Sequence, residues 1–430
     1  MAREYKDSGI EWIGQIPREW SVELIGNNIK EINDKNDDSS EDNALQFKMG
    51  SIISKKGGDS KYNPESLAAY TKVKEGDIVI NGLNLSFDFI SQRVGLVREK
   101  GVITSTYLTL RPSSLLHSVF VNYLFKAYDN CKAFHGMGRG LRQILAYREL
   151  KNQKLIYPPL PEQQKIADYL DKVCGEVDEM VALQETMIEE LKAYKQSVIT
   201  EAVTKGLDPN VPMRNSGIDW IGDIPEHWGI QRLKTLGWTQ NGISQSGDYF
   251  GEDYEYPFIS YSDAYKNYSL PYPSGRANSS EEDRQKYSLT EGDVLFTRTS
   301  ETIEEIGFAS TCIETIPNVV YSGFLIRFRP TSENLFKGFS KYYFRSQVHR
   351  AYFVKQMNIV TRASLGQDLL KNLVVLLPPL DEQRAIASYL DTKCSEIDSL
   401  IALKQAKIDE LKEYKKSVIY EYVTGKKEVC

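Results

Sequence analysis

Two long stretches of the chain repeat apolar residues at steps of three and four positions, with polar residues between them. In the first, from Pro158 to Gly206, this heptad spacing is interrupted only at Gln184. Such steps place side chains on one face of a helix and are typical of a coiled coil. We therefore predict a long helix whose apolar face is covered by a partner. The apolar positions are Ile166, Leu170, Val173, Val177, Met180, Met187, Leu191, Tyr194 and Val198.

The second stretch, residues 378–426, repeats residues 158–206 with 27 identities in 49 aligned positions. A proline pair begins each stretch and a glycine lies near its end, so each helix should run about 42 residues, roughly 60 Å. In the second copy the apolar face is Ile386, Leu390, Ile397, Leu400, Leu411, Tyr414 and Val418, weakened by Lys393, Lys404 and Lys407. We expect the helices to pair antiparallel as a coiled coil about a pseudo-two-fold axis. The expected packing residues are Ile166, Leu170, Val177, Leu191, Ile386, Leu390, Ile397 and Leu411.

A shorter repeat contains two tryptophans and a proline. SGIEWIGQIPREW at residues 8–20 and SGIDWIGDIPEHW at residues 216–228 agree at nine of 13 positions. The second copy follows the first helix, whereas the copy that should follow the second helix stands at the N-terminus. We therefore expect a circular arrangement, with the chain ends adjacent and each motif clamping a helix end.

The segments between these repeats differ from each other. They share only EGDIVI (75–80) with EGDVLF (291–296), and TLRP (109–112) with RFRP (327–330). Gly-Asp followed by β-branched and aromatic residues predicts turns and strands. The expected fold class is α+β, with two globular domains joined by the two helices. The expected boundaries are 1–20 for the N-terminal motif, 21–157 for the first domain, 158–228 for the central helix and motif, 229–377 for the second domain and 378–430 for the last helix.

Composition places the chain among soluble globular proteins. It has 430 residues, of which 41% are hydrophobic and 26% charged. No apolar run is long enough to span a membrane, and the first residues lack the apolar core of a signal peptide, so we expect a cytoplasmic protein with no membrane partner. The five cysteines form no CxxC pair, which favours reduced thiols over a zinc site.

Catalytic motifs are missing from the sequence. It contains no GxxxxGK[ST] phosphate loop, no HExxH, and no Asn/Asp-Pro-Pro-aromatic motif of adenine methyltransferases. The four histidines are scattered, and packing or surface roles suit them better than general-base roles. We expect neither a catalytic residue nor a metal or cofactor held by this chain. An enzyme with unrecognised motifs is the alternative, and activity of the purified chain would reveal it.

Local charge departs from the net charge of −6. Residues 93–157 contain 11 Lys and Arg against three Asp and Glu, and residues 327–371 contain nine against two. Two matching basic regions suit neutralisation of DNA phosphates, and arginine can also bind guanine edges. Solvated faces that balance acidic segments elsewhere are the alternative explanation.

One loop in each basic region combines small residues with Arg and Gln. These loops are CKAFHGMGRGLRQ (131–143) and VKQMNIVTRASLGQ (354–367). Small residues allow close approach to DNA, so we expect the loops to contact it; a purely structural turn is the alternative. The candidate DNA-binding residues are Lys132, Arg139, Arg142, Gln143, Lys355, Arg362 and Gln367.

In its repeated motifs, the chain resembles the specificity subunits of type I restriction–modification systems. The residues that carry the resemblance are the two tryptophan motifs together with PPLPEQQKIADYLD and PPLDEQRAIASYLD at the starts of the long helices. The resemblance in organisation extends over essentially the whole chain. The intervening segments would then be target recognition domains, which vary because they read different DNA sequences.

The resemblance implies a non-catalytic reader of double-stranded DNA. Each domain would read one half of a bipartite site, and the helices would set the gap and dock two methylase subunits. S-adenosylmethionine would be bound by the methylase partner, and restriction and translocase subunits would join for cleavage. A coiled-coil scaffold whose variable domains bind protein partners is the alternative.

Overall fold

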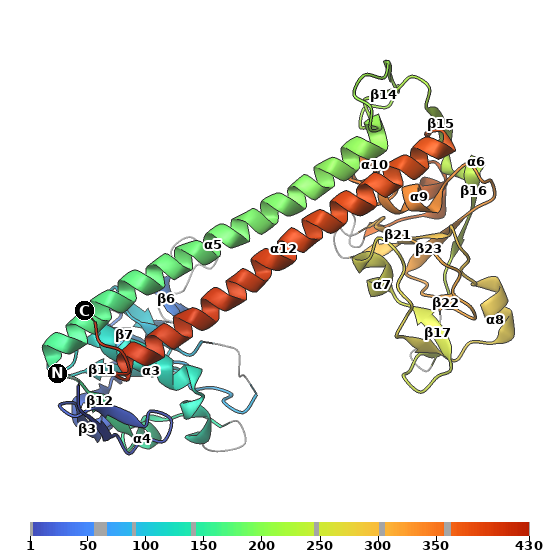
Figure 1. Cartoon of the computed structure of the whole chain (residues 1–430). Coiled ribbons are helices and arrows are strands. Elements are labelled where there is room, and N and C mark those ends of the chain that lie inside the picture. The colour runs from blue at the N-terminus through green and yellow to red at the C-terminus, as the bar shows by residue number, and fades with distance from the viewer. Residues whose placement is uncertain are drawn as a thin grey trace. The chain divides into compact units, whose positions relative to one another are not determined.

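The computed structural model describes residues 3–55, 67–87, 92–138, 143–244, 249–300, 306–356 and 363–429. The chain divides into two compact units, the first formed by Met1–Glu185 with Gln405–Cys430 and the second by Thr186–Lys404. The division cuts two long helices, α5 (Leu160–Lys205) and α12 (Leu380–Val423), so that each unit contains part of both (Figure 1). Both helices follow a proline pair and end beside a glycine with positive φ, Gly206 or Gly425.

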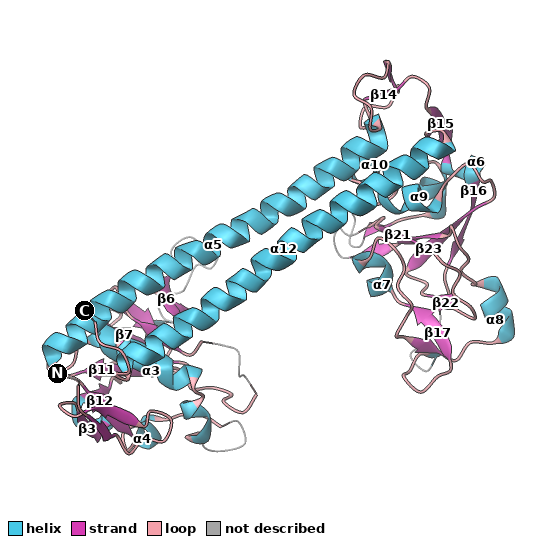
Figure 2. Ribbon diagram, viewed as in Figure 1, coloured by secondary structure: helices cyan, strands magenta, loops and turns pink. Residues whose placement is uncertain are grey.

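The first unit is built on a four-stranded antiparallel sheet in the order β4-β11-β8-β9. Figure 2 shows strands of this unit in magenta and its helices in cyan. These strands are β4 (Ile29–Glu31), β11 (Leu108–Pro112), β8 (Ile78–Ile80) and β9 (Val94–Leu96). Four further antiparallel pairs are β1 (Tyr5–Asp7) with β2 (Gln15–Pro17), β3 (Ser21–Leu24) with β12 (Lys154–Tyr157), β5 (Leu45–Lys48) with β6 (Ser51–Ser54), and β7 (Thr71–Val73) with β10 (Gly101–Ile103). The other helices of this unit are α1 (Ile25–Asn28), α3 (Ser118–Asn130), the 3₁₀ helix η1 (Ala133–Gly136) and α4 (Tyr147–Leu150).

The second unit repeats this pairing with a sheet in the order β16-β23-β19-β21. These strands are β16 (Gly237–Asn241), β23 (Leu325–Pro330), β19 (Val294–Thr297) and β21 (Ala309–Thr311). Further pairings are β13 (Met213–Asn215) with β14 (Asp223–Pro225), β15 (Gly229–Arg232) with β25 (Val374–Leu377), β17 (Tyr256–Ile259) with β18 (Arg276–Ala277) and β22 (Val320–Tyr321), and β20 (Thr299–Ser300) with β24 (Ala363–Ser364). The other helices are α6 (Leu233–Leu236), α7 (Tyr261–Lys266), α8 (Glu281–Lys286), α9 (Lys337–Tyr343), α10 (Gln347–Gln356) and α11 (Gln367–Lys371).

An ion pair with a buried aspartate links the EGD segment to the RP segment in both domains. Arg111 donates to both carboxylate oxygens of Asp77, from Nε at 2.7 Å and from a terminal nitrogen at 2.6 Å. Arg329 binds Asp293 in the same bidentate way, at 2.8 and 2.6 Å. In each sheet the pair joins the turn before one central strand to the neighbouring strand, so the shared segments carry the same contact in both domains.

The tryptophan motif joins the start of one long helix to the end of the other. Trp20 Nε1 donates to Glu162 near the start of α5 at 2.9 Å, and the Trp20 ring lies against Gly425 after α12. In the second unit Trp228 Nε1 donates to Glu382 near the start of α12 at 3.0 Å, beside Gly206 after α5. The prediction that each motif clamps a helix end is therefore confirmed, with a second helix included in the clamp.

The glutamine of each PPLxEQ motif binds the backbone just before a helix of the adjoining domain, α3 in the first unit and α9 in the second. Gln163 accepts from the backbone N–H of His117, just before α3, at 2.8 Å. Gln383 accepts in the same way from Phe336, just before α9, at 2.8 Å. Both glutamines are buried and also donate to proline carbonyls at 2.8 Å. The motifs that carry the family resemblance therefore act as joints between long helices and domains.

The long helices run antiparallel within each unit. In the first unit the Tyr169 and Tyr422 rings are 4.4 Å apart, and Asp178 binds Lys415 at 2.6 Å. In the second, Lys404 lies 3.1 Å from the Met187 sulfur and Lys195 binds Asp398 at 2.6 Å. Rising numbers on one helix therefore meet falling numbers on the other.

The apolar stripe predicted from the sequence is displaced by one residue over part of each helix. Met180, Tyr194, Leu400 and Tyr414 were expected in the helix contact, but all four are exposed. The inward-facing positions instead include Cys174, Val181, Ile188 and Lys195 in α5, and Cys394, Ile401, Ile408 and Lys415 in α12. Gln184, the expected interruption, is also part of the covered face. The sequence pattern was misleading because Met and Tyr are more hydrophobic than Gln and Lys. Lys195 and Lys415 can nevertheless lie in the helix contact, because each forms an ion pair with an aspartate of the other helix.

The eight predicted packing residues occupy two kinds of surroundings. Ile166 and Leu170 are buried in the core of the first domain together with the end of α12, including Val418 and Val423. Ile386 and Leu390 are buried likewise in the second domain core, with Val198 and Val203 of α5. Toward the middle of the helices Val177, Ile397 and Leu411 are buried and Leu191 is half-buried. The stripe thus serves the domain cores at its ends as well as the helix pair.

Candidate DNA interface

The predicted loop of the first unit is fixed at both ends by residues with positive φ. Lys132, before η1, has φ 57° and Gln143 has φ 47°. The carbonyl of Gln143 accepts from the backbone N–H of Leu85 at 3.2 Å. Arg139 and Arg142 lie outside the described residues. Tight backbone geometry therefore positions the ends of this loop, which supports a structural role for Lys132 and Gln143.

A second segment, missed by the sequence reasoning, lies beside this loop. Residues 81–87 follow the central strand β8, and their Gly82 carbonyl accepts from the N–H of Leu145 at 2.9 Å. A Cβ atom at Gly82 would lie 2.8 Å from the Leu145 carbonyl oxygen, so glycine permits this approach. The two segments therefore form one edge, to which residues 81–87 bring Asn81, Asn84 and an exposed Phe87.

A buried arginine holds the second segment. The guanidinium of Arg93 donates to the carbonyls of Asn81 at 3.0 Å and Leu83 at 2.7 Å. The backbone N–H of Arg93 donates to Asp129 at 2.8 Å, and burial raises the pKa of Asp129 despite this bond. The backbone of the second segment is therefore anchored to the buried side chain of Arg93.

The second unit has the same two-segment edge. Strand β20, which follows the central strand β19, pairs with β24 through Thr299 and Ser364. The N–H of Leu365 donates to the Arg298 carbonyl at 2.7 Å. Arg362 lies outside the described residues. The signal that could have predicted the edge was the EGD strand, since the missed segment follows it in both copies.

Lys355 and Gln367, both predicted to contact DNA, lie in different surroundings. The ammonium of Lys355 is 3.3 Å from the Asp219 carboxylate and 5.6 Å from the centre of the Trp220 ring, in the second tryptophan motif. The Gln367 side chain accepts from Thr239 at 2.9 Å and donates to Asn241 at 3.0 Å, both on β16. The bonds of Gln367 engage both of its polar atoms, so a DNA contact would have to compete with them, whereas Lys355 is exposed beside an exposed carboxylate.

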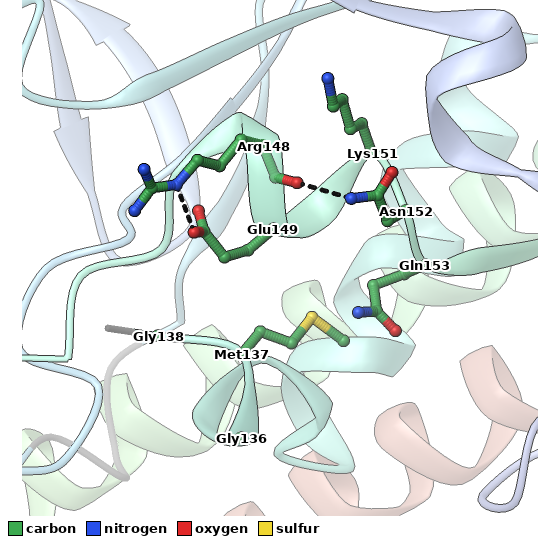
Figure 3. A pocket seen from close by; sticks show the side chains of 8 residues that line it. All are labelled: Gly136, Met137, Gly138, Arg148, Glu149, Lys151, Asn152 and Gln153. Atoms are coloured by element: carbon green, nitrogen blue, oxygen red, sulfur yellow. Dashed lines mark hydrogen bonds and ion pairs between the residues drawn. The ribbon is translucent and has the colours of Figure 1, made fainter. Parts of the chain in front are cut away.

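The loop of the first unit forms one wall of a polar cavity of about 610 Å³ (Figure 3). Gly136, Met137 and Gly138 line one side, and residues from α4 and the turn after it line the other. Figure 3 shows Arg148 Nε bonded to Glu149 and the Asn152 side chain bonded to the Arg148 carbonyl. Arg148 and Lys151 thus add cations beside the loop that sequence reasoning had counted within the basic region but had not singled out.

The described residues show no apparatus for metal chemistry. Nowhere in the described ranges do three or more His, Cys, Asp or Glu side chains gather in a way that could hold a metal ion. Nor does a described helix combine the length and apolar character that crossing a membrane requires.

The family model for the type I restriction modification DNA specificity domain matches residues 73–193 and 225–413. The chain belongs to this family. This confirms the resemblance inferred from the tryptophan and PPLxEQ motifs, and it confirms the predicted function class of DNA recognition within a restriction–modification system. In that class the specificity subunit is the non-catalytic component.

Relatives in the family extend over most of the chain. The type I restriction enzyme MjaVIII specificity subunit of Methanocaldococcus jannaschii is 24% identical over 96% of this chain and 94% of its own length. The EcoKI specificity subunit of Escherichia coli is 27% identical over 68% of this chain and 63% of its own length. The match to the MjaVIII subunit thus includes both domains and both helices.

Solved structures share the fold of this specificity subunit. A chain from a study of complex assembly and conformational transition of the type I R-M system gives a TM-score of 0.70 at 16% identity, over 95% of this chain and 98% of that chain. The HsdS subunit from Thermoanaerobacter tengcongensis gives 0.50 at 16% identity with the same coverage. These likenesses support two recognition domains with long helices and mixed α and β content.

Proposed function

We propose that each domain of this specificity subunit reads one half of a bipartite site in double-stranded DNA. The observation that carries the proposal is the two-segment edge, which recurs after the central strand in both units. Residues 81–87 with 143–145, and residues 298–300 with 363–365, would face the bases. The loops 131–143 and 354–367, with Arg139, Arg142 and Arg362, would extend these edges.

The two long helices would form an antiparallel coiled coil that sets the gap between the half-sites. The support is the repeated stripe, in which every inward position of α5 recurs 220 residues later in α12. In the Lys195–Asp398 pair the lysine is on α5, and in the Asp178–Lys415 pair it is on α12. A pseudo-two-fold axis between the helices would require this exchange. The N-terminal motif against the end of α12 would close the arrangement into a circle.

Exposed apolar residues on the helices would dock the methylase subunits. In the first unit these are Met180, Leu183 and Tyr414, and in the second Leu400, Leu403 and Tyr194. The two sets are equivalent under the 220-residue repeat, so two copies of one partner could use them. Large exposed apolar side chains that recur at matched positions are typical of interaction surfaces.

The chemistry would lie with the partners. S-adenosylmethionine would be bound by the methylase subunits, with no cofactor held by this chain, and restriction and translocase subunits would join for cleavage. This chain would supply only the recognition of the DNA sequence.

The test is co-expression with a methylase subunit, followed by genome-wide mapping of methylated adenine. One bipartite motif with a fixed gap is the expected result. A stable complex that adds no methylation would contradict the proposal and favour a scaffold whose variable domains bind proteins. Methylation by the purified chain alone would contradict the assignment of catalysis to the partner.

A further inference from the structure

A similar turn follows α4 in the first unit and α11 in the second. In each unit it comes shortly after the two-segment edge proposed to read bases, which is called the reading edge below. Lys151 follows α4, and Lys371 is the last residue of α11, 220 positions later. The next residue is asparagine in both, and its side chain donates to the carbonyl four positions earlier, at 3.1 Å for Asn152 and 2.9 Å for Asn372. This bond caps the helix and fixes the turn, so each lysine side chain starts from a defined backbone position.

In the first unit the turn carries an accessible positive charge. Lys151 is exposed, and its ammonium has no acidic partner among the described residues. Arg148 is exposed as well and is paired with Glu149 through Nε at 2.6 Å, so the turn holds two cations against one carboxylate. Both side chains border the 610 Å³ cavity in Figure 3.

In the second unit the same turn gathers two further cations. The Asn372 side-chain oxygen accepts from Arg232 at 3.1 Å and from Lys234 at 3.3 Å. An amide oxygen is neutral, so it orients the two cations without cancelling their charge. The equivalent positions of the first unit, 208 residues earlier, are Leu24 and Gly26. Lys371 lies 3.6 Å from the exposed carboxylate of Asp368, so the turn holds three cations against one carboxylate and keeps a net positive charge.

The turn lies close to the segment proposed to read bases. Helix α11 begins at Gln367, three positions after the end of the β24 edge strand, and ends at Lys371. Five helical residues span only about 7 Å, which corresponds to about two nucleotides along the axis of one DNA strand. DNA bases held at the edge would therefore place phosphates within reach of the turn.

We propose that these two capped turns are phosphodiester-binding patches, formed by Arg148 and Lys151 in the first unit and by Arg232, Lys234 and Lys371 in the second. The inference rests on the proposed function. Cations on phosphates set affinity and register but carry no sequence information. The patches therefore hold the backbone while the reading edge beside each selects the bases.

The experiment measures DNA binding by the complex of this chain with its methylase partner as salt is raised. The variants are R148Q/K151Q for the first unit and R232Q/K234Q/K371Q for the second. The DNA probes are a duplex with the methylated motif and one of unrelated sequence. Each lost phosphate contact should reduce the slope of log K against log salt by about 0.9, so the loss in affinity should be largest at the low-salt end.

Matched controls remove exposed lysines outside the patches. Lys172→Gln changes α5 in the first unit, and Lys286→Gln changes α8 in the second. Support requires lower slopes on both probes for the patch variants, slopes like wild type for the controls, and an unchanged methylated motif.

Three results would overturn the patches while leaving the proposed function intact. The first is unchanged slopes in a complex that binds DNA. The second is a changed methylated motif, which would indicate that the patch residues read bases. The third is loss of the methylase subunit from the variant complexes, which would indicate that the patch residues contact a protein. A wild-type complex that binds neither probe would overturn the proposed function itself, and the patches with it.

Discussion

The ammonium of Lys195 lies 2.7 and 2.6 Å from the two carboxylate oxygens of Asp398, linking α5 to α12. In the first unit Lys415 of α12 contacts both oxygens of Asp178 on α5 at 2.6 Å. Each lysine stands at an inward position of its helix. A charged residue at an inward position destabilises any helix register in which it does not meet its partner. These two pairs therefore specify the register in which the helices align.

Reversing one of these charges should destabilise the helix pair. Lys195→Glu places a carboxylate beside Asp398, and we expect a loss of about 1 kcal/mol in the free energy of unfolding. The double variant K195E/D398K should recover most of the loss, because it restores an ion pair with exchanged ends. Urea unfolding of the full chain measures both. Lys172→Glu, on an exposed position of α5, is the control, and equal losses in the single and double variants would contradict the assignment.

Removing the carboxylate of Glu382 should weaken the joint at the start of α12. Glu382 accepts from both Trp228 Nε1 and His227, and the buried indole N–H of Trp228 would lose its partner. We expect Glu382→Ala to cost about 1–3 kcal/mol and Glu382→Gln to cost less, since its amide oxygen can still accept. Asp381→Ala changes the exposed neighbouring carboxylate and should be near neutral in thermal unfolding. Similar effects at the two positions would refute this role.

Breaking the ion pair in the second sheet should cost more than breaking one at the surface. The Asp293 side chain is buried, so Arg329→Gln leaves its charge without compensation, at an expected cost of about 3 kcal/mol. Arg18→Gln removes the partner of Glu4 in a pair whose two side chains are exposed, and should cost under about 1 kcal/mol. Chemical denaturation of both variants gives the comparison. Equal costs would mean that the sheet does not depend on this pair.

Acid should weaken the second unit through a buried histidine. Burial lowers the pKa of His349 to about 3, and its ring packs against Tyr343 at 4.5 Å between centroids. Because the folded pKa lies below the unfolded value near 6.5, stability from the neutral ring is complete above about pH 6.5. It falls as pH drops from there toward 3, by up to about 1.4 kcal/mol per pH unit.

His349→Phe should therefore flatten the acid side of the stability profile. The measurement is the urea midpoint of wild type and variant between pH 7 and pH 4. The two proteins should differ more at pH 4 than at pH 7, in favour of the variant at low pH. Parallel profiles would show that protonation of this ring does not limit stability.

Lengthening both helices should change the gap without changing the half-sites. Seven residues inserted at equivalent points of α5 and α12 preserve the stripe and add about 10 Å to each helix. We expect the methylated motif to keep both half-sites and to gain separation between them. Insertion into α5 alone shifts the stripes against each other and serves as the mismatched control. An unchanged gap after the double insertion would refute the helices as the spacer.

Much of the fold follows from repeats and periodicity, which are local properties of the chain. The long helices, their glycine ends, the strands after each EGD and the clamping tryptophans were all predicted from short patterns. Asp77 and Asp293 could be noticed as recurring residues, but their arginine partners become partners only when the strands pair. The reading edges were half predicted, since 131–143 has a distinctive composition whereas residues 81–87 do not.

By itself, the sequence determined that the molecule is built twice, and which motifs join helix to domain, because duplication leaves identical letters at fixed offsets. Only the tertiary structure decided which side of each helix is covered. Met180 and Tyr194 are more apolar than Gln184 and Lys195, yet the latter face inward. Hydrophobicity ranks residues one at a time, whereas burial depends on the partner across the contact, and Asp398 makes the position of Lys195 favourable.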